Sequence, residues 1–228
     1  MESNSNNYEI INQIITSKNN FFITWKAWTW KTTLIRYYME KMNLNCVVVA
    51  PTWVAAINVW WETIHSFFKF PVWIIPQKAS ELWIKKHEKW DLKYERLDTL
   101  IIDEISMVRA DMLDCINIFL RKIRWIDTSF WWVKIVLVWD LYQLPPIVET
   151  KETEFSKKYD SPYFFSSNVF LSKENNFKTI ILEKIYRQTD DLFVNILNNI
   201  REWKYTNQDL DELNKSINNN FTDKQVIT

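Results

Sequence analysis

The sequence contains no glycine and fourteen tryptophans in 228 residues. A chain of this length carries about 7% glycine on average, or roughly sixteen residues. Tryptophan therefore occurs here at about the frequency that glycine normally has. Without glycine, no residue of the chain adopts a positive φ at little cost or lets a ligand approach the backbone closely. Two questions follow: what a glycine-containing parent would do, and whether the chain as written can do it.

Other absences exclude several classes of protein. The two cysteines, Cys46 and Cys115, are too few and too far apart for a zinc site or a disulfide framework, which fits a reducing compartment. Residues 1–7 lack the basic and then apolar pattern of a signal peptide. No apolar run approaches the roughly eighteen residues that a membrane-spanning helix needs. We therefore expect a cytoplasmic protein with no membrane partner.

The charge balance is neutral, with 28 basic and 28 acidic residues. The chain thus has no overall basic surface for nucleic acid, although a local groove could still bind a strand. The length indicates one large domain or one and a half, and 47% hydrophobic residues suffice for a full core.

The run from Thr24 to Thr33 reads T-W-K-A-W-T-W-K-T-T. It becomes a complete phosphate-binding loop, G-x-x-x-x-G-K-T, if Trp25, Trp28 and Trp30 are read as glycine. An apolar run precedes it and a helix-like segment follows, which is the context that such a loop requires.

The remaining tryptophans also occupy positions typical of glycine. Core tryptophans would follow apolar faces with a period of two or 3.6 residues. These instead follow strand-like runs, form pairs in apparent turns, or follow a helix-like segment where glycine often caps the helix. The clearest examples are Trp53, Trp139, the pairs at 60–61 and 131–132, and Trp203.

Three origins would explain this pattern. Every glycine could have been replaced deliberately. Alternatively, UGA codons that some bacteria read as glycine could have been translated as tryptophan, and the richness in Asn, Ile and Lys suits the A+T-rich genome that such a code implies. The third origin, a protein that really contains these tryptophans, ranks last.

Alternating apolar strands and helices predict an α/β fold, with a parallel sheet covered by helices on both faces. We predict an N-terminal lead-in at 1–20, a nucleotide-binding domain at 21–204, and a polar linker or truncated edge at 205–228. The charged segment 78–96 is expected to be solvated. The predicted strands are 21–23, 46–50, 99–102 and 133–138, and the predicted helices are 32–42, 110–122 and 192–201.

A phosphate loop binds ATP because its backbone N–H groups meet the phosphates at the N-terminus of a helix. Lys31 would reach the β- and γ-phosphates, and the Thr32 hydroxyl would hold Mg²⁺. The other predicted phosphate-binding residues are Lys26, Ala27, Thr29 and Thr33.

Two adjacent acids follow the predicted strand at 99–102. Asp103 would hold Mg²⁺, and Glu104 would orient or deprotonate the attacking water. After the next strand, Asp140 and Gln143 could place a polar sensor near the γ-phosphate. Arg187 could supply positive charge to the transition state, although a lone arginine is more often a surface residue.

Six motifs in this order resemble the Pif-type DNA helicases, superfamily-one motors related to the RecD subunit. The resemblance covers the chain from Phe21 to about Lys204, and each mismatch with a family glycine is a tryptophan. The matching stretches are 25–33, 50–56, 63–67 (T-I-H-S-F), 102–107 (I-D-E-I-S-M), 138–146 (V-W-D-L-Y-Q-L-P-P) and 186–188 (Y-R-Q).

The resemblance implies a RecA-like first motor domain that couples hydrolysis of ATP with Mg²⁺ to 5′-to-3′ movement on single-stranded DNA. It implies that 52–56 and 63–67 line the strand channel, and His65 would lie near the DNA backbone. Gln13 is a weak candidate for the family's adenine-reading glutamine. No motif of a second motor domain follows, so that domain would be a missing partner. The predicted DNA-binding residues are Thr52, Val54, Ala55, Thr63 and His65.

The rival interpretation is that the chain as written has no activity. Tryptophan provides neither the positive φ nor the close backbone approach that the loops need. Each strained backbone position costs about 1–3 kcal/mol, and total native stability is only about 5–15 kcal/mol. We therefore expect the all-tryptophan chain to be inactive and poorly folded.

Overall fold

The computed structural model describes residues 2–25, 31–42, 45–53, 62–79, 81, 92–123, 128–139, 144–147, 157–175, 177–182, 192, 195–196, 199–200 and 203–215. Within these ranges a six-stranded sheet has the order β3-β2-β4-β5-β1-β6, and every pairing is parallel. The strands are β1 (Asn20–Trp25), β2 (Cys46–Ala50), β3 (Glu62–Thr63), β4 (Thr99–Ile102), β5 (Lys134–Trp139) and β6 (Phe177–Leu182).

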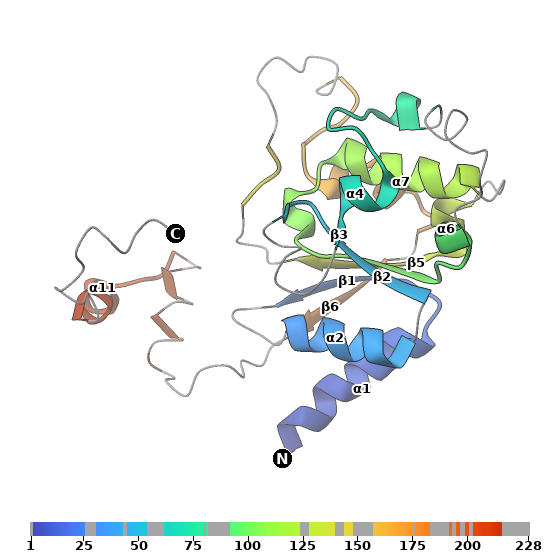
Figure 1. Cartoon of the computed structure of the whole chain (residues 1–228). Helices are drawn as coiled ribbons and strands as arrows, with labels where there is room; N and C mark the ends of the chain where they lie inside the picture. The colour runs from blue at the N-terminus through green and yellow to red at the C-terminus, as the bar shows by residue number, and fades with distance from the viewer. Residues whose placement is uncertain are drawn as a thin grey trace, which may run out of the picture.

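Helices cover both faces of this sheet. In Figure 1, α1 and α2 lie below the sheet, and α4, α6 and α7 lie above it. The helices are α1 (Glu2–Thr16), α2 (Lys31–Met42), α4 (Ile64–Phe68), α6 (Leu92–Glu95), α7 (Ala110–Ile123), α9 (Asn168–Leu171) and α11 (Asn207–Lys215). Short 3₁₀ turns are η2 (Ile105–Met107), η3 (Ser129–Trp132) and η4 (Phe164–Ser166). The predicted α/β fold is confirmed.

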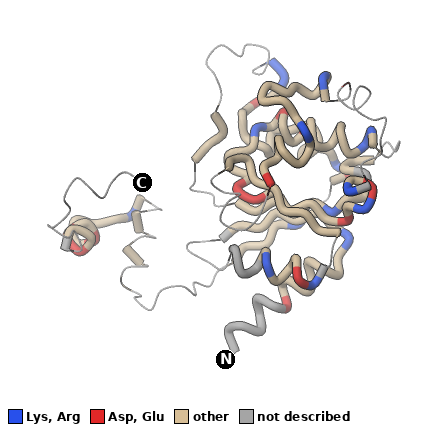
Figure 2. Tube along the Cα trace, in the orientation of Figure 1, with Lys and Arg blue, Asp and Glu red and all other residues tan. Residues whose placement is uncertain are grey.

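The central strands are buried on both faces, as their continuous apolar sequences predict. Along β5, Ile135 and Leu137 pack in the core beneath α7, whereas Val136 and Val138 pack in the core against α1 and α2. The alternation follows from the two-residue period of a strand. Charged residues of both signs are interspersed along the described Cα trace in Figure 2, in keeping with the neutral balance.

Most predicted elements are present, and several others were missed. The predicted strands correspond to β1, β2, β4 and β5, and two predicted helices correspond to α2 and α7. Strands β3 and β6 and helices α1 and α11 were not predicted. The predicted helix at 192–201 is confirmed at residues 192, 195–196 and 199–200, which are all helical, and its other five residues lie outside the described residues. The segment at 78–96 is not solvated throughout, because Ala79 and Tyr94 are buried in the core.

Helix α1 contributes to the core rather than merely leading into it. Ile11 and Ile14 are 2% and 0% exposed and pack in the same cluster as Ile35 and Tyr38 of α2. The ammonium group of Lys134, at the start of β5, donates hydrogen bonds to the carbonyl groups of Ile14 and Ile15. These carbonyls end α1 and have no partner within the helix, so Lys134 caps it.

Candidate nucleotide site and adjoining groove

The predicted phosphate loop follows β1 at the carboxyl edge of the sheet. Helix α2 begins at Lys31, so Lys31, Thr32 and Thr33 form its first turn. The N-terminus of a helix attracts phosphate through its free N–H groups and its dipole. Lys26, Ala27 and Thr29 lie outside the described residues.

Asp103 and Glu104 come directly after β4 at the same edge. The Asp103 side chain is buried, and its backbone N–H donates to the carbonyl of Val49 at 2.9 Å. Strand β5 separates β4 from β1, so the two strand ends lie about 10 Å apart at the usual strand spacing. Asp103 on one side of this gap and Thr32 on the other are the residues that would hold Mg²⁺, an ion that prefers oxygen ligands.

Glu104 has a strained backbone. Its φ of 53° and ψ of 43° lie in the left-handed region, which is unfavourable for a residue with a Cβ atom. Its N–H donates to the Oδ1 atom of Asp103 at 2.9 Å. Strain of this kind costs about 1–3 kcal/mol and is concentrated at functional sites.

Trp139 ends β5 between the two strands that carry the predicted site. Its ring centroid lies 5.6 Å from that of Phe22 and 5.3 Å from that of Phe164. Its indole Nε1 atom is buried and has no hydrogen-bond partner among the described residues. An unsatisfied buried donor costs about 1–3 kcal/mol, so the indole fits this position poorly. Asp140, Gln143 and Arg187 lie outside the described residues.

Of the tryptophans that the structure describes, two have the backbone conformation that favours glycine. Trp132 has a φ of 62° and Trp203 a φ of 57°, and both side chains are exposed. The N–H of Trp203 donates to the carbonyl of Ile200, and that of Lys204 donates to the carbonyl of Asn199 at 2.8 Å. This pair of bonds is the Schellman motif, in which glycine usually occupies the position of Trp203. The predicted helix cap at Trp203 is confirmed.

Three of the predicted DNA-binding residues, Thr52, Thr63 and His65, lie near the carboxyl ends of β2 and β3. Thr52 follows β2, and Thr63 precedes α4. The Thr63 hydroxyl accepts a hydrogen bond of 3.1 Å from the N–H of Ser66, so it caps α4. His65 lies in the first turn of α4. Val54 and Ala55 lie outside the described residues.

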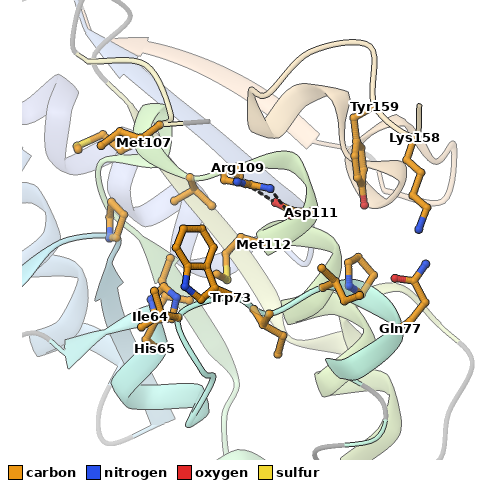
Figure 3. Close-up of a pocket in the computed structure, with 17 residues that line it drawn as sticks. Ile64, His65, Trp73, Gln77, Met107, Arg109, Asp111, Met112, Lys158 and Tyr159 are labelled. Atoms are coloured by element: carbon orange, nitrogen blue, oxygen red, sulfur yellow. Dashed lines mark hydrogen bonds and ion pairs between the residues drawn. The ribbon is translucent and has the colours of Figure 1, made fainter. Parts of the chain in front are cut away.

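His65 lines an open groove of about 650 Å³ between α4 with its following turn and the start of α7 (Figure 3). Burial lowers the pKa of His65, and a hydrogen bond to the backbone of Val72 opposes this shift. Within the part of the chain that the structure describes, the Nε2 atom is buried without a hydrogen-bond partner. Apolar groups dominate the walls, which include Ile64, Trp73, Met107 and Met112.

Two contacts that the sequence analysis missed fix the opposite wall of this groove. Arg109 makes a two-pronged ion pair with Asp111, with distances of 3.0 and 2.8 Å. The Tyr159 hydroxyl donates to the Oδ2 atom of Asp114 at 2.9 Å. Arg109 and Asp111 lie only two residues apart, whereas Tyr159 lies 45 residues from Asp114, so no local pattern could signal the second contact.

The predicted adenine-reading residue is not supported by its position. Gln13 lies near the end of α1, which leads into the amino end of β1, whereas the phosphate loop follows the carboxyl end. In the part of the chain that the structure describes, no helix could cross a membrane and no group of three His, Cys, Asp or Glu side chains could hold a metal.

Residues 2–211 match the family model of PIF1-like helicases. The ATP-dependent DNA helicase PIF1 of Candida albicans is 32% identical over 203 residues, which cover 87% of this chain and 22% of that protein. The ATP-dependent DNA helicase Pif1 of Bdellovibrio bacteriovorus is 25% identical and matches 92% of this chain and 46% of its own length.

Solved structures agree with this relationship. The Pif1 helicase from Bacteroides in complex with ADP-AlF3 and single-stranded DNA has a TM-score of 0.80 and is 38% identical. The match covers 95% of this chain and 50% of that one. The Pif1 helicase from Candida albicans has a TM-score of 0.73 at 29% identity, over 90% of this chain and 45% of that one. The present chain thus spans half or less of these relatives.

Proposed function

Since the chain belongs to the PIF1-like helicase family, we propose that its glycine-containing form is the first motor domain of an ATP-dependent DNA helicase. The observation that carries this proposal is the edge at which α2 begins, where the buried Asp103 and the strained Glu104 follow β4. The bound ADP-AlF3 and single-stranded DNA of the Bacteroides relative support the same substrates here. The RecA-like motor domain is proposed to span 21–204, with 1–20 before it and 205–228 after it.

Each residue has a defined role in this proposal. The loop residues Lys26, Ala27 and Thr29 and the first turn of α2 hold the phosphates of ATP, with Lys31 at the β- and γ-phosphates. Thr32 and Asp103 would hold Mg²⁺, which would supply positive charge to the phosphates. The remaining phosphate-site roles belong to Thr33 as a phosphate contact, Glu104 as the base, Gln143 as the γ-phosphate sensor and Arg187 as the transition-state cation.

DNA would pass the carboxyl ends of β2 and β3. Thr52, Val54, Ala55, Thr63 and His65 are the proposed strand contacts. Unwinding itself would need a second motor domain, because hydrolysis is coupled to movement by closure of two domains around the nucleotide.

The chain as written is proposed to be inactive. Trp25, Trp28 and Trp30 place three large side chains in a loop whose backbone must meet phosphate oxygens. The buried, unpaired indole of Trp139 supports the same conclusion. The alternative to a functional motor domain is therefore that the chain as written has no activity. It would then be a glycine-to-tryptophan variant or a mis-decoded sequence.

Calorimetry with ATP and Mg²⁺ tests this proposal. We expect heat of binding from the chain with glycine at all fourteen positions and none from the chain as written. In the glycine form, Lys31→Ala should weaken binding at least about tenfold. Lys41→Ala, on the exposed last turn of α2, is the matched control and should bind normally. Equal binding by the written chain and the glycine form would contradict the proposal.

A further inference from the structure

Residues 157–169, the linking segment, are fixed to the middle of α7 by one buried carboxylate. Asp114 is 4% exposed and accepts four hydrogen bonds from this segment. Its Oδ2 atom accepts from the Tyr159 hydroxyl at 2.9 Å and from the backbone and side-chain N–H groups of Asn168 at 3.1 and 2.8 Å. Its Oδ1 atom accepts from the N–H of Val169 at 2.9 Å. Because a buried carboxylate without partners is costly, these bonds hold the segment firmly against α7.

One end of the linking segment borders the groove that contains His65, a proposed strand contact. Lys158 and Tyr159 lie across this groove from His65 in Figure 3. Lys158 is exposed and positively charged, which suits it to a phosphate of the strand. Burial raises the pKa of Tyr159 and the nearby Asp114 carboxylate raises it further, so the phenol stays protonated and donates to Asp114. A strand at this groove would therefore contact the residue next to the one that Asp114 holds.

The middle of the linking segment contacts the chain just beyond Glu104. The N–H of Ala110 donates to the carbonyl of Pro162 at 3.0 Å. Arg109 forms an antiparallel bridge with Tyr163. A short connection that is mostly η2 joins Arg109 to Glu104. A displacement of the segment would thus reach the proposed catalytic base.

The same segment supports the strand that leads into the phosphate loop. The Phe164 ring is 1% exposed, and its centroid lies 5.7 Å from that of Phe22 on β1. Trp139 packs against both rings, but the contact between Phe164 and Phe22 is direct. The hydrogen bonds and the bridge that hold the segment involve no tryptophan. The linking segment is therefore expected to keep these contacts in the glycine form.

Coupling between two sites also requires a part of the molecule with two conformations, which the two sites favour differently. The backbone of Glu104 is the candidate, because its left-handed φ of 53° is strained and a relaxed conformation competes with it. The linking segment holds the chain that follows Glu104. Its position consequently affects which conformation of Glu104 is favoured.

We propose that the linking segment couples strand binding to ATP hydrolysis at Glu104, and that Asp114 is the positioning residue on which this coupling depends. The inference rests on the proposed function, since it assumes that the chain binds a strand and hydrolyses ATP. With Asp114 in place, a strand contact at Lys158 displaces the segment together with the start of α7. Without it, the strand still binds and ATP is still hydrolysed, but strand binding no longer accelerates hydrolysis.

The test measures ATP hydrolysis with and without oligothymidylate, in the glycine form joined to a second motor domain from the family. Asp114→Asn preserves size but replaces one acceptor oxygen with an NH₂ group, which cannot accept the bonds that this oxygen received. We expect stimulation by the strand to fall from at least about tenfold to less than about twofold, a typical size for the loss of coupling. The rate without DNA, the KM for ATP and the affinity for oligothymidylate, measured by fluorescence anisotropy, should each stay within about a factor of two.

Two further variants separate coupling from stability. Asn117→Ala is the matched control, because Asn117 is also buried on α7 but accepts a hydrogen bond from the N–H of Phe130 in η3 rather than from the linking segment. It should lower stability and leave stimulation unchanged. Tyr159→Phe keeps the ring and removes one of the four bonds to Asp114. Stimulation should then fall by an intermediate factor of about three, the effect of one hydrogen bond.

Three results would overturn the inference. The first is unchanged stimulation in Asp114→Asn, or in Tyr159→Phe if Asp114→Asn does not fold. The second is an equal loss of basal rate, strand affinity and stimulation in Asp114→Asn, because Asp114 would then have only a structural role. The third is the same loss of stimulation in Asn117→Ala, which would assign the effect to α7 as a whole. Absence of stimulation in the unsubstituted joined protein would instead contradict the proposed function itself, and the inference with it.

Discussion

The backbone N–H of Glu104 donates a 2.9 Å hydrogen bond to Oδ1 of Asp103, the residue before it. The φ angle of Glu104 is near 53°, a left-handed conformation that residues with a Cβ atom usually avoid. The hydrogen bond helps to hold Glu104 in this conformation. The two acids consequently differ in environment, because Asp103 is buried and Glu104 is half-buried. This difference suits Asp103 to binding a metal ion and Glu104 to contacting a water molecule.

Replacement of Glu104 by Gln should abolish ATP turnover and spare ATP binding. The substitution preserves size and removes only the group that activates water. We expect hydrolysis to fall at least about a hundredfold in the glycine form joined to a second motor domain from the family. A phosphate-release assay measures turnover, and calorimetry measures binding. Turnover within a factor of two of the unsubstituted protein would show that Glu104 is not the base.

Tryptophan at positions 132 and 203 should destabilise the fold through its backbone. Starting from the glycine form, we expect Trp at either position to lower the unfolding free energy by about 1–2 kcal/mol, since both need a left-handed backbone. Urea titration measures this change. Trp at position 53 is the matched control, because Trp53 is also exposed but has no positive φ. It should change stability by less than about 0.5 kcal/mol.

Lys134 should make stability increase with pH above about 8. Burial lowers the pKa of its ammonium group to about 8, and the nearby Cys46 raises it in part. Between about 8 and the unfolded value of 10.5, the unfolded chain binds more protons than the folded chain, so stability rises with pH.

The check is the difference in unfolding free energy between the glycine form and its Lys134→Met variant. The unfolding free energy of the glycine form should rise relative to that of the Lys134→Met variant between pH 8 and pH 9.5, because the variant has lost the titrating group. A difference that stays constant over this range, or that shifts the other way, would show that the ammonium pKa is not lowered by folding.

The coding DNA provides a test of the origin of the tryptophans. UGA codons at the fourteen positions, read as glycine in the source organism, would mean that the natural protein is the glycine form. UGG codons would instead mean that the protein really contains tryptophan, and the proposed activity would then not apply to the natural product.

Much of the fold could be predicted from the sequence because its central strands are continuous apolar runs. Apolar composition alone predicts the strands at Val47 to Ala50 and Leu100 to Ile102. Strand β6 did not, because it lies at the sheet edge and exposes Lys178 and Thr179. Helix α1 was missed for a related reason, since its polar residues conceal an apolar stripe of Ile11 and Ile14.

The site was predictable only where motif spacing fixes geometry. The position of Asp103 and Glu104 after a buried strand was correct, whereas the strain at Glu104 could not be read from residue types. The groove could not be predicted from the sequence, because its lining residues His65, Met112 and Tyr159 lie far apart in the chain. Burial lowers the pKa of His65 and a backbone contact with Val72 opposes that shift, and no sequence pattern predicts either effect.

The rate of ATP hydrolysis with and without single-stranded DNA tests the central claim most directly. The glycine form, joined to a second motor domain from the family, should hydrolyse ATP with Mg²⁺ at least about tenfold faster when oligothymidylate is present, since the strand completes a closed two-domain site. The chain as written, joined in the same way, should show no hydrolysis. Hydrolysis by the glycine form that single-stranded DNA leaves unchanged would contradict the motor-domain account and leave only a phosphate-loop ATPase.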